Sequence, residues 1–550
     1  MEKIIKEVLR EIENGFYVIP EIQRKYIWKN TQIRDLIDSI YRGYPIGGIV
    51  YWEIPNNIIK DENFRSIFTP LADGIPTENG RYMIIDGQQR LTSLLLVKRG
   101  EIIIKRGEYE KRRKIHLYFN PIEERFELGN KEIKNNPEWF DVSEIIRSEN
   151  TFEIINRQAE KFKDENIRKN PVILKKIQTF LERFRTYQLP LIQVKIEKDD
   201  FLEIFEEISN IFINLNSKGT RIKFSDLSLA LLTAKTRKEI GTSFRKKFED
   251  ILRELEEKDF GIIDETVLIR TYSVIATETV RFNEVRKILE NKNGKEIEDL
   301  LERSKEAVFH TITLLKDIGI TTGRFLQSKY LIVPIAYYIY KDILKKGNII
   351  KEGDKLKVAK WLILSSMEKR YTGKLETELR EDIKSIKEKG IEGLFSNLSL
   401  KEIPLSYFDG EFENRHLTLL LILFKMNKTR DWNLKSKPNI KEITELDTKD
   451  LSIHHIFPKE YLERRNDEMS YNKFANITII SEKANKSIGF RDPRKYLKEL
   501  KEVDENLLRE HFVPTDESLW ELDNFEEFLK KRIELLIEFL QEKIGILVVI

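Results

Sequence analysis

Residues 452–489 read SIHHIFPKEYLERRNDEMSYNKFANITIISEKANKSIG, and this stretch carries the pattern that decides the fold of the C-terminal region. Two of the six histidines of the chain, His454 and His455, are adjacent here, and Asn476 and Asn485 follow in that order. One imidazole can take a proton from water, while a second imidazole and a carboxamide can hold a divalent cation. These residue types are together sufficient for the hydrolysis of a phosphodiester.

The same residues predict a β-hairpin followed by a short helix. Pro458 ends the first apolar run, and residues 476–480 (NITII) are rich in β-branched side chains. Ser481 can cap a helix that carries Asn485. We expect this unit to bring His454 and Asn485 together on its concave face.

The spacing and the residue types resemble the HNH nucleases, also called the ββα-metal family. The resemblance implies that His455 is the general base and that His454 and Asn485 are the metal ligands. It also implies that Asn476 orients the ring of His455 and that Lys486 lies beside the scissile phosphate.

His454 stands where the commonest form of that family has an aspartate. A neutral set of ligands holds Mg²⁺ more weakly than a carboxylate does, and imidazole is a better partner for Mn²⁺, Ni²⁺ or Zn²⁺. We therefore expect a divalent cation, Mg²⁺ or Mn²⁺, whose identity stays open. In the alternative interpretation, the adjacent histidines are ordinary surface or packing residues.

A second informative stretch, residues 83–96, reads MIIDGQQRLTSLLL. It predicts an apolar strand, a turn at Asp86 and Gly87, and an amphipathic helix from Gln88. Free backbone N–H groups and the positive end of the helix dipole would face a bound phosphate, and Arg90 could pair with it. In the alternative interpretation, Asp86 only caps the helix and Arg90 is a solvated charge.

Together with residues 19–52, which read IPEIQRKYIWKNTQIRDLIDSIYRGYPIGGIVYW, this stretch resembles the N-terminal domain of GmrSD-type restriction endonucleases, which has a ParB-like core. The resemblance implies a nucleoside-triphosphate site in which Asp86 has a catalytic role. The residues implied to form this site are Gln23, Arg24, Asp86, Gly87, Gln88, Gln89 and Arg90. A third family element, FINLNSKGTRIKFSD at residues 212–226, adds Asn214 and Asn216, although Asn, Ser and Gly are also ordinary turn formers.

GmrSD-type proteins pair this domain with a C-terminal HNH domain, and the two motifs occur here in that order. We expect a helix-rich α+β protein in three parts. These are a ParB-like α/β nucleotide-binding domain at residues 1–235, a helical scaffold at 236–410, and an HNH endonuclease domain (ββα-metal) with a C-terminal helix at 411–550. Apolar residues at three- and four-residue spacing predict the scaffold, including one helix over Thr236–Lys258.

Outside the motifs, the sequence predicts residues with a structural role rather than catalytic or binding residues. His310 and His416 lie within apolar helical segments and are expected to be packed and hydrogen-bonded. The last helix, at residues 525–544, is expected to pack against the nuclease domain.

The overall charge restricts where nucleic acid can bind. The chain has 550 residues, 34% of them charged, and a formal net charge of +3, so any such surface must be local. The candidate for contacting DNA phosphates is the cluster beside the HNH helix, namely Lys486, Arg491, Arg494 and Lys495. No cysteine occurs, which excludes disulfides and thiolate metal ligands. The N-terminus lacks the apolar core of a signal peptide and no apolar run approaches a membrane span, so we expect a cytoplasmic protein without membrane contact.

The expected function is that of a nucleotide-regulated, metal-dependent DNA endonuclease of a prokaryotic anti-phage system. Family resemblance implies that hydrolysis of GTP, ATP or another nucleoside triphosphate is coupled to the sensing of modified phage DNA. One HNH site cuts one strand, so a double-strand break requires a homodimer, a second event or a partner chain. Two other functions stay open: a nucleotide-dependent DNA-binding regulator with a structural HNH fold, and an RNA-cleaving toxin that uses the same metal site.

Overall fold

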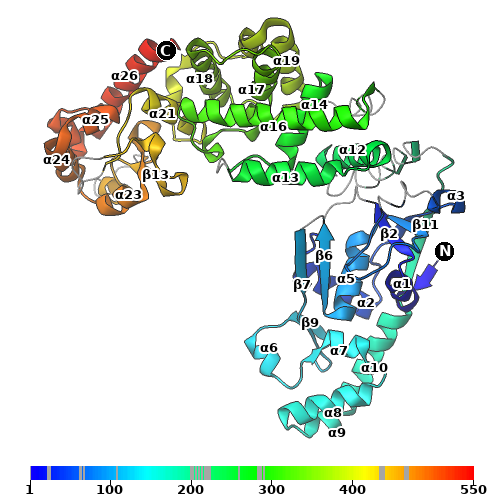
Figure 1. Ribbon diagram of the computed structural model, residues 1–550. Coiled ribbons are helices and arrows are strands. Elements are labelled where there is room, and N and C mark those ends of the chain that lie inside the picture. Colours follow the sequence, from blue (N-terminus) through cyan, green and yellow to red (C-terminus); the bar gives the residue numbers. More distant parts are fainter. Residues whose placement is uncertain are drawn as a thin grey trace. The chain divides into compact units, whose positions relative to one another are not determined.

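The computed structural model describes residues 2–20, 26–60, 65, 68–106, 109–198, 203–204, 207–208, 211, 215, 224–257, 261–280, 288, 291–432, 440–463 and 470–549. The chain divides into two compact units, Met1–Lys246 and Lys247–Ile550 (Figure 1). The larger sheets lie in the first unit and the second is mainly helical, so the mixed, helix-rich content agrees with the predicted α+β class. The predicted boundaries at residues 235 and 410 stay predictions.

The first unit is built on a mixed six-stranded sheet. Its strands read in spatial order β1 (Glu2–Ile4), β11 (Gln188–Val194), β3 (Ile49–Glu53), β5 (Tyr82–Asp86), β2 (Tyr17–Pro20) and β4 (Phe68–Thr69). The central strands are short runs of β-branched and aromatic residues, and most of their side chains are buried. A three-stranded sheet, β10 (Phe140–Asp141), β8 (Leu117–Asn120) and β9 (Arg125–Leu128), and a hairpin, β6 (Glu101–Arg106) with β7 (Tyr109–Lys114), complete the described strands of this unit.

Helices pack their apolar faces into one core with this sheet. In the first helix, for example, Ile5, Val8, Leu9 and Ile12 recur at helical spacing and are all buried. The described helices of the unit are α1 (Ile5–Glu13), α2 (Asn30–Arg42), α3 (Asn56–Ile59), α5 (Gln88–Arg99), α6 (Lys131–Asn135), α7 (Val142–Arg147), α8 (Thr151–Phe162), α9 (Asn166–Lys169), α10 (Pro171–Thr186) and α12 (Phe224–Ile240).

The second unit begins within α13 (Phe244–Glu256) and continues as a stack of helices. These are α14 (Glu265–Thr277), α16 (Gly294–Asp317), α17 (Ile332–Tyr338), a π-helical turn at Ile339–Leu344, α18 (Glu352–Met367), α19 (Leu375–Lys389), α20 (Gly393–Ser396) and α21 (Arg415–Met426). The single helix predicted over Thr236–Lys258 is wrong, because α12 ends at Ile240 and α13 starts at Phe244. Gly241 separates them with a φ of 70°, a left-handed conformation that commonly ends a helix.

The two histidines expected to be packed differ in their surroundings. His416 is buried, accepts a hydrogen bond from the Glu413 backbone N–H, and contacts the carbonyl oxygen of Tyr407, so this prediction is confirmed. The same prediction is wrong for His310, which is exposed on α16 beside the exposed ring of Phe309. Apolar neighbours along a helix do not reveal which side of it faces solvent.

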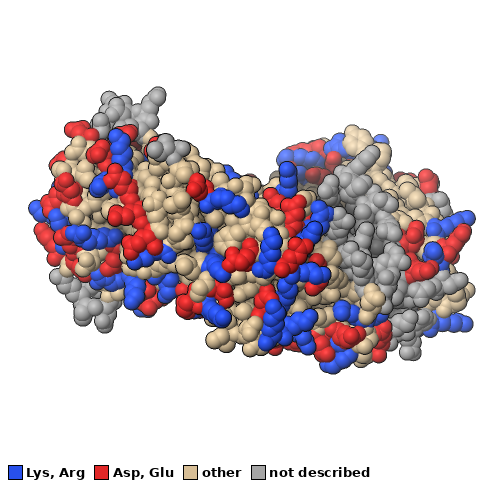
Figure 2. Space-filling model, turned by 90° about the horizontal axis from the view of Figure 1, so that it is seen from above, with Lys and Arg blue, Asp and Glu red and all other residues tan. Residues whose placement is uncertain are grey.

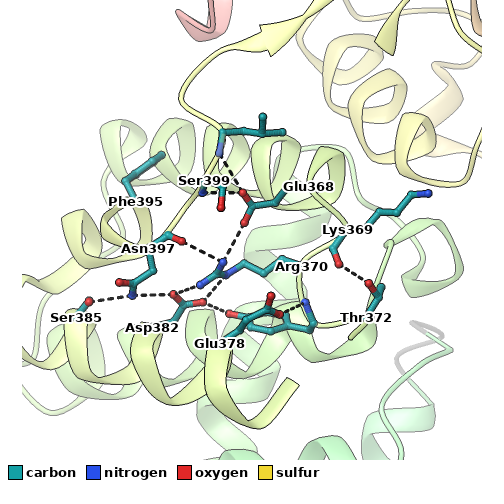
Figure 3. A network of polar contacts seen from close by, with 12 residues as sticks. Glu368, Lys369, Arg370, Thr372, Glu378, Asp382, Ser385, Phe395, Asn397 and Ser399 are labelled. Atoms are coloured by element: carbon teal, nitrogen blue, oxygen red, sulfur yellow. Dashed lines mark hydrogen bonds and ion pairs between the residues drawn. The ribbon is translucent and has the colours of Figure 1, made fainter. Parts of the chain in front are cut away.

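A buried ion pair joins α18 to α19 in the helical stack (Figure 3). Arg370 donates from Nε and Nη2 to the two carboxylate oxygens of Asp382, at 2.8 and 2.7 Å, and Asp382 is fully buried. Tyr371 and Asn397 also donate to this carboxylate, and Glu368 accepts from Nη1 of Arg370 at 2.9 Å. Every group in the centre of this network therefore has a partner, which is the condition under which a buried charge pair is tolerated.

The chain ends in a small hairpin and a set of helices that surround it. They are β13 (Leu451–His455), α22 (Lys459–Leu462), β14 (Ile477–Ser481), α23 (Glu482–Ile488), α24 (Pro493–Asp504), α25 (Asn506–Glu510) and α26 (Phe525–Ile544), while β12 (Ile403–Pro404) pairs with β15 (Val548–Val549). The prediction for the last helix is confirmed, since Arg532 of α26 donates to the carbonyls of Ala475 and Ile477 beside the hairpin. Within the described chain, none of the helices has the length and apolar character needed to cross a bilayer.

Candidate functional site

The predicted hairpin and helix at residues 452–489 are confirmed. β13 and β14 pair antiparallel, with His454 opposite Thr478. Ser481 caps α23 by accepting a hydrogen bond from the backbone N–H of Ala484 at 3.0 Å, as its position in the sequence predicts. This cap fixes where the helix begins and therefore which face of the hairpin Asn485 reaches.

His454 and Asn485 meet on that face. Nδ1 of His454 lies 2.8 Å from Oδ1 of Asn485, and Nδ2 of Asn485 donates to the hydroxyl of Ser452 at 2.8 Å. His454 is only 3% exposed, and burial lowers its pKa to about 4. The ring is therefore neutral at pH 7, which is the form that binds a metal ion.

The donor set fits a loosely held divalent cation. An imidazole nitrogen and a carboxamide oxygen can both act as metal ligands, and a bound cation would replace the present hydrogen bond from Nδ1–H of His454 to Oδ1 of Asn485. Trp432 and Tyr496 pack edge-on against the His454 ring, and its Nε2 is buried without a hydrogen-bond partner. In the described ranges, no cluster of three or more His, Cys, Asp or Glu could hold a metal ion, so water and a substrate phosphate would have to supply the remaining ligands.

His455 has different neighbours, as expected for successive residues of a strand, whose side chains point to opposite faces. Its Nε2 lies 3.4 Å from Oδ1 of Asn472, and the ring of Tyr471 approaches edge-on at 5.3 Å. Burial lowers the pKa of His455 below its ordinary value of 6.5, against the opposing hydrogen bond to Asn472. The half-buried ring is thus neutral near pH 7 and able to accept a proton.

Asn476 holds backbone rather than the ring of His455. Its Oδ1 accepts from the Phe457 N–H at 2.8 Å, and its Nδ2 donates to the carbonyls of Phe457 and Tyr471 at 2.9 and 2.8 Å. The amide of Asn476 is used in this way, and the side chain that contacts the His455 ring is that of Asn472. Asn476 holds the backbone of the segment that follows the histidines. The prediction that Asn476 contacts the ring of His455 is therefore wrong, and Asn472 makes that contact. No sequence pattern marks Asn472, because only folding brings it near the ring.

Three of the four cations predicted to bind DNA have carboxylate partners. Lys486 pairs with Glu482, Arg491 with Glu499, and Arg494 with Asp492 at 2.7 Å and Glu521 at 3.0 Å. Lys495 is exposed. The face of the molecule in Figure 2 shows Lys and Arg side chains interspersed with Asp and Glu, as expected from the small net charge. The pair of Lys486 with Glu482 is exposed and therefore weak, and the pairs of Arg491 and Arg494 are partly exposed, so a phosphate could compete for these cations.

In the first unit, β5 leads through Gly87 directly into α5, as the DGQQR motif predicts. Gly87 has a φ of 99° and is the N-cap, so Asp86 does not cap the helix. Arg90 is 16% exposed on its side chain, donates to Asp86 at 2.9 Å and also donates to the carbonyl of Ile46 at 3.0 Å. Both parts of the alternative interpretation of this motif, an Asp86 cap and a solvated Arg90, are therefore wrong.

The two glutamines of the motif face inward. Oε1 of Gln89 accepts from the backbone N–H groups of Ile27 and Trp28, at 2.9 and 3.3 Å, and Gln88 is buried. The motif therefore gathers the segment around Ile27 and the loop around Ile46 at the N-terminus of α5. Gln23, Arg24, Asn214 and Asn216 lie outside the described residues.

The first unit of the chain is similar to a known protein family. Residues 5–233 match the family model of the GmrSD restriction endonuclease N-terminal domain. This match supports the GmrSD-type family. The matched region includes the DGQQR turn and most of the first unit. Over nearly its whole length the chain is also similar to the uncharacterised protein MJ0686 of Methanocaldococcus jannaschii, with 21% identity and 99% of each chain covered.

Lowering the pH from 7.5 to 5 is expected to destabilise the second unit. Burial lowers the pKa of His454 and His416 to about 4 and that of His511 to about 3, from ordinary values of 6.5. Between pH 6.5 and about 4 the unfolded chain binds protons that the folded chain does not, so this stability is full above pH 6.5 and falls below it. Each pH unit below 6.5 costs about 1 kcal/mol per ring. Urea unfolding at pH 7.5 and at pH 5 measures the loss of stability. An unchanged urea midpoint would contradict the prediction.

Proposed function

We propose that the chain is a metal-dependent DNA endonuclease of a GmrSD-like restriction system, regulated by a nucleoside triphosphate. The observation that carries this proposal is the pairing of His454 with Asn485 at 2.8 Å beside a second, neutral histidine, within a hairpin and helix. The match of residues 5–233 to the N-terminal domain of a restriction endonuclease family supports a place in DNA restriction. A role in defence against phage follows from that family description and is part of the proposal.

In the proposed reaction, His455 accepts a proton from the attacking water. Its Nε2–H donates to Oδ1 of Asn472, which leaves Nδ1 unprotonated as the base. Asn476 holds the backbone of Phe457, two residues further on, and so limits movement of the base. His454 and Asn485 would hold the divalent cation, which when bound supplies positive charge to stabilise the phosphate and the leaving oxygen.

The test is a cleavage assay with the purified full chain. Supercoiled plasmid and a structured RNA are each incubated with Mg²⁺, with Mn²⁺, or with EDTA. We expect nicking of DNA with either metal ion, faster with Mn²⁺ because two neutral donors favour it over Mg²⁺, and none with EDTA. Cleavage of RNA alone would replace the proposal with that of an RNA-cleaving toxin. DNA binding without any cleavage would indicate a regulator with a structural hairpin and helix.

We further propose that the N-terminus of α5 binds the phosphates of the nucleotide. Gly87 places backbone N–H groups at the positive end of the helix dipole without a side-chain cap, and Arg90 is held there by Ile46. Asp86 is 41% exposed on its side chain and can contact a ligand while it stays paired with Arg90. Gln88, which is buried, and Gln89, which is half-buried, support this turn. Gln23, Arg24, Asn214 and Asn216 remain part of the proposed site.

The change Asp86→Asn is expected to reduce nucleoside-triphosphate hydrolysis by about 10-fold or more, because it removes a charged hydrogen-bonding group while keeping the shape of the side chain. Phosphate release from GTP and ATP measures this effect. Asp38→Asn is the matched control, because Asp38 forms the same type of pair with Arg42, four residues along α2. Equal hydrolysis by the two variants, with equal thermal unfolding, would remove Asp86 from the nucleotide site.

The sensing of modified phage DNA belongs to the same proposal, as does assembly for double-strand cleavage. One hairpin site can cut one strand, so a second copy of the chain or a partner would supply the other cut. Cleavage of glucosylated, hydroxymethylated and unmodified DNA, with and without nucleotide, distinguishes a modification-dependent enzyme from one that ignores modification.

A further inference from the structure

Phe490 is exposed and follows Asn485, one of the proposed metal ligands, five residues later in the sequence. Its side chain is 69% exposed, although it directly follows a segment whose apolar residues Ala484 and Ile488 are buried. Single exposed apolar residues are common on protein surfaces and need no explanation by themselves. The position of Phe490 after α23 and the charges of the surrounding residues indicate a role in binding a substrate.

Phe490 is placed by the helix that carries Asn485. The backbone N–H of Gly489 donates to the carbonyl of Asn485 at 2.8 Å, so the chain leaves α23 one turn after this proposed metal ligand. Gly489 has φ 55° and ψ −129°, a combination that is strained for any residue with a Cβ. The sharp exit directs the chain away from the helix, and Phe490 is the first residue after it.

The surrounding segment is strongly basic. Between Glu482 and Lys498 the sequence has six cations and two carboxylates, whereas the whole chain of 550 residues has a formal net charge of +3. The cations are Lys483, Lys486, Arg491, Arg494, Lys495 and Lys498, and all except the half-buried Arg491 are exposed. These cations precede and follow Phe490 in the sequence, and phosphates would compete with the carboxylate partners of Lys486, Arg491 and Arg494. Cations and an exposed aromatic ring are the groups by which proteins hold a nucleic-acid strand, with phosphates on the cations and a base on the ring.

We propose that Phe490 stacks on a nucleobase of the DNA strand next to the phosphodiester that His455 cleaves. The inference rests on the proposed nuclease function and deepens it by naming a substrate class. A ring can stack on a base only if that base has left its neighbours in the duplex, and this costs least at a mismatch, a bulge or a damaged base. The favoured substrate is therefore DNA with an unstacked base beside the cleaved bond.

The test measures DNA binding by the full chain in a His455→Ala background, which prevents cleavage. One duplex is fully paired, and the other carries 2-aminopurine opposite a mismatch. The change Phe490→Ala is expected to weaken binding of the mismatched duplex about 10-fold and to remove the quenching of 2-aminopurine, while Phe490→Trp keeps both. Ile349→Ala is the matched control, because Ile349 is an apolar residue of the same unit that is 78% exposed.

The salt dependence separates stacking from charge. Phe490→Ala is expected to leave the slope of log Kd against log salt unchanged, whereas Lys495→Ala reduces it by about 1. Equal binding by the Phe490→Ala and Ile349→Ala variants would overturn the inference, and so would Phe490-dependent binding of RNA but not DNA. Cleavage by the chain with His455 intact is scored separately. Phe490-dependent binding of DNA without cleavage would therefore uphold the stacking of Phe490 on a base, and would refute the proposed nuclease together with the placing of that base next to a cleaved bond.

Discussion

The change His455→Ala is expected to lower the rate of metal-dependent DNA nicking by about 10² to 10⁴, the usual contribution of a general base. The ring is half-buried and contacts Asn472, and its lowered pKa keeps it neutral below the ordinary value of 6.5. For the chain with His455 intact, the acidic limb of the pH–rate profile should accordingly lie below pH 6.5. Initial rates of plasmid nicking from pH 5 to 8 measure both effects.

The matched control for this change is His310→Ala, because His310 is an exposed histidine of the same unit, on α16. The His310→Ala protein should nick DNA at the same rate as the chain without substitutions. Added imidazole should restore part of the activity of the His455→Ala protein, which a purely structural role for His455 would not allow. Equal nicking by the two variants would remove His455 from catalysis.

The change Asp382→Ala is expected to destabilise the second unit by about 3–5 kcal/mol. It would leave Arg370, which is 4% exposed, with Glu368 as its remaining carboxylate partner and without the acceptors of its Nε and Nη2 groups. Burial by itself would lower the pKa of Arg370, but its bonds to Asp382 raise that pKa above its ordinary value. Tyr371 would lose its acceptor, and so would Asn397, whose bond to Asp382 is drawn in Figure 3. Urea unfolding of the full chain, followed by the signal of the second unit, measures the loss.

Asp299→Ala is the control for this change, because Asp299 forms an exposed pair with Lys295 on α16. Removing that pair should cost less than about 0.5 kcal/mol. The double change Arg370→Met with Asp382→Leu should be less destabilising than Asp382→Ala alone, because it removes both charges together. If Asp382→Ala lowered the free energy of unfolding no more than Asp299→Ala does, this result would show that water or another group neutralises Arg370.

Much of the local structure around both sites could be predicted from the sequence. The β-branched run at 477–480 forms a strand, Ser481 caps α23, and Gly87 forms the turn before α5. The limits of α26 agree with the predicted helix. Each of these features depends on backbone preferences and on side chains a few residues apart, which the sequence displays directly.

The partners of the site residues could be predicted only in part. The meeting of His454 with Asn485 follows from the geometry of a hairpin and a helix, and the structure joins them. The contact of Asn472 with His455 and the use of Asn476 on the backbone of Phe457 depend on where folding places these asparagines relative to the end of β13. No pattern of spacing encodes that placement.

By itself, the sequence determined where strands, turns and caps form, and which residue types could carry metal, base and nucleotide chemistry. Only the tertiary structure decided which groups from separate elements meet, apart from His454 and Asn485. It brought Arg90 to the carbonyl of Ile46, and it joined Arg370 to Asp382 in the core. The physical reason is that a hydrogen bond or ion pair needs its two atoms within about 3 Å. For residues far apart in the chain, that separation is set by the packing of whole elements, whereas local propensity acts only over a few residues.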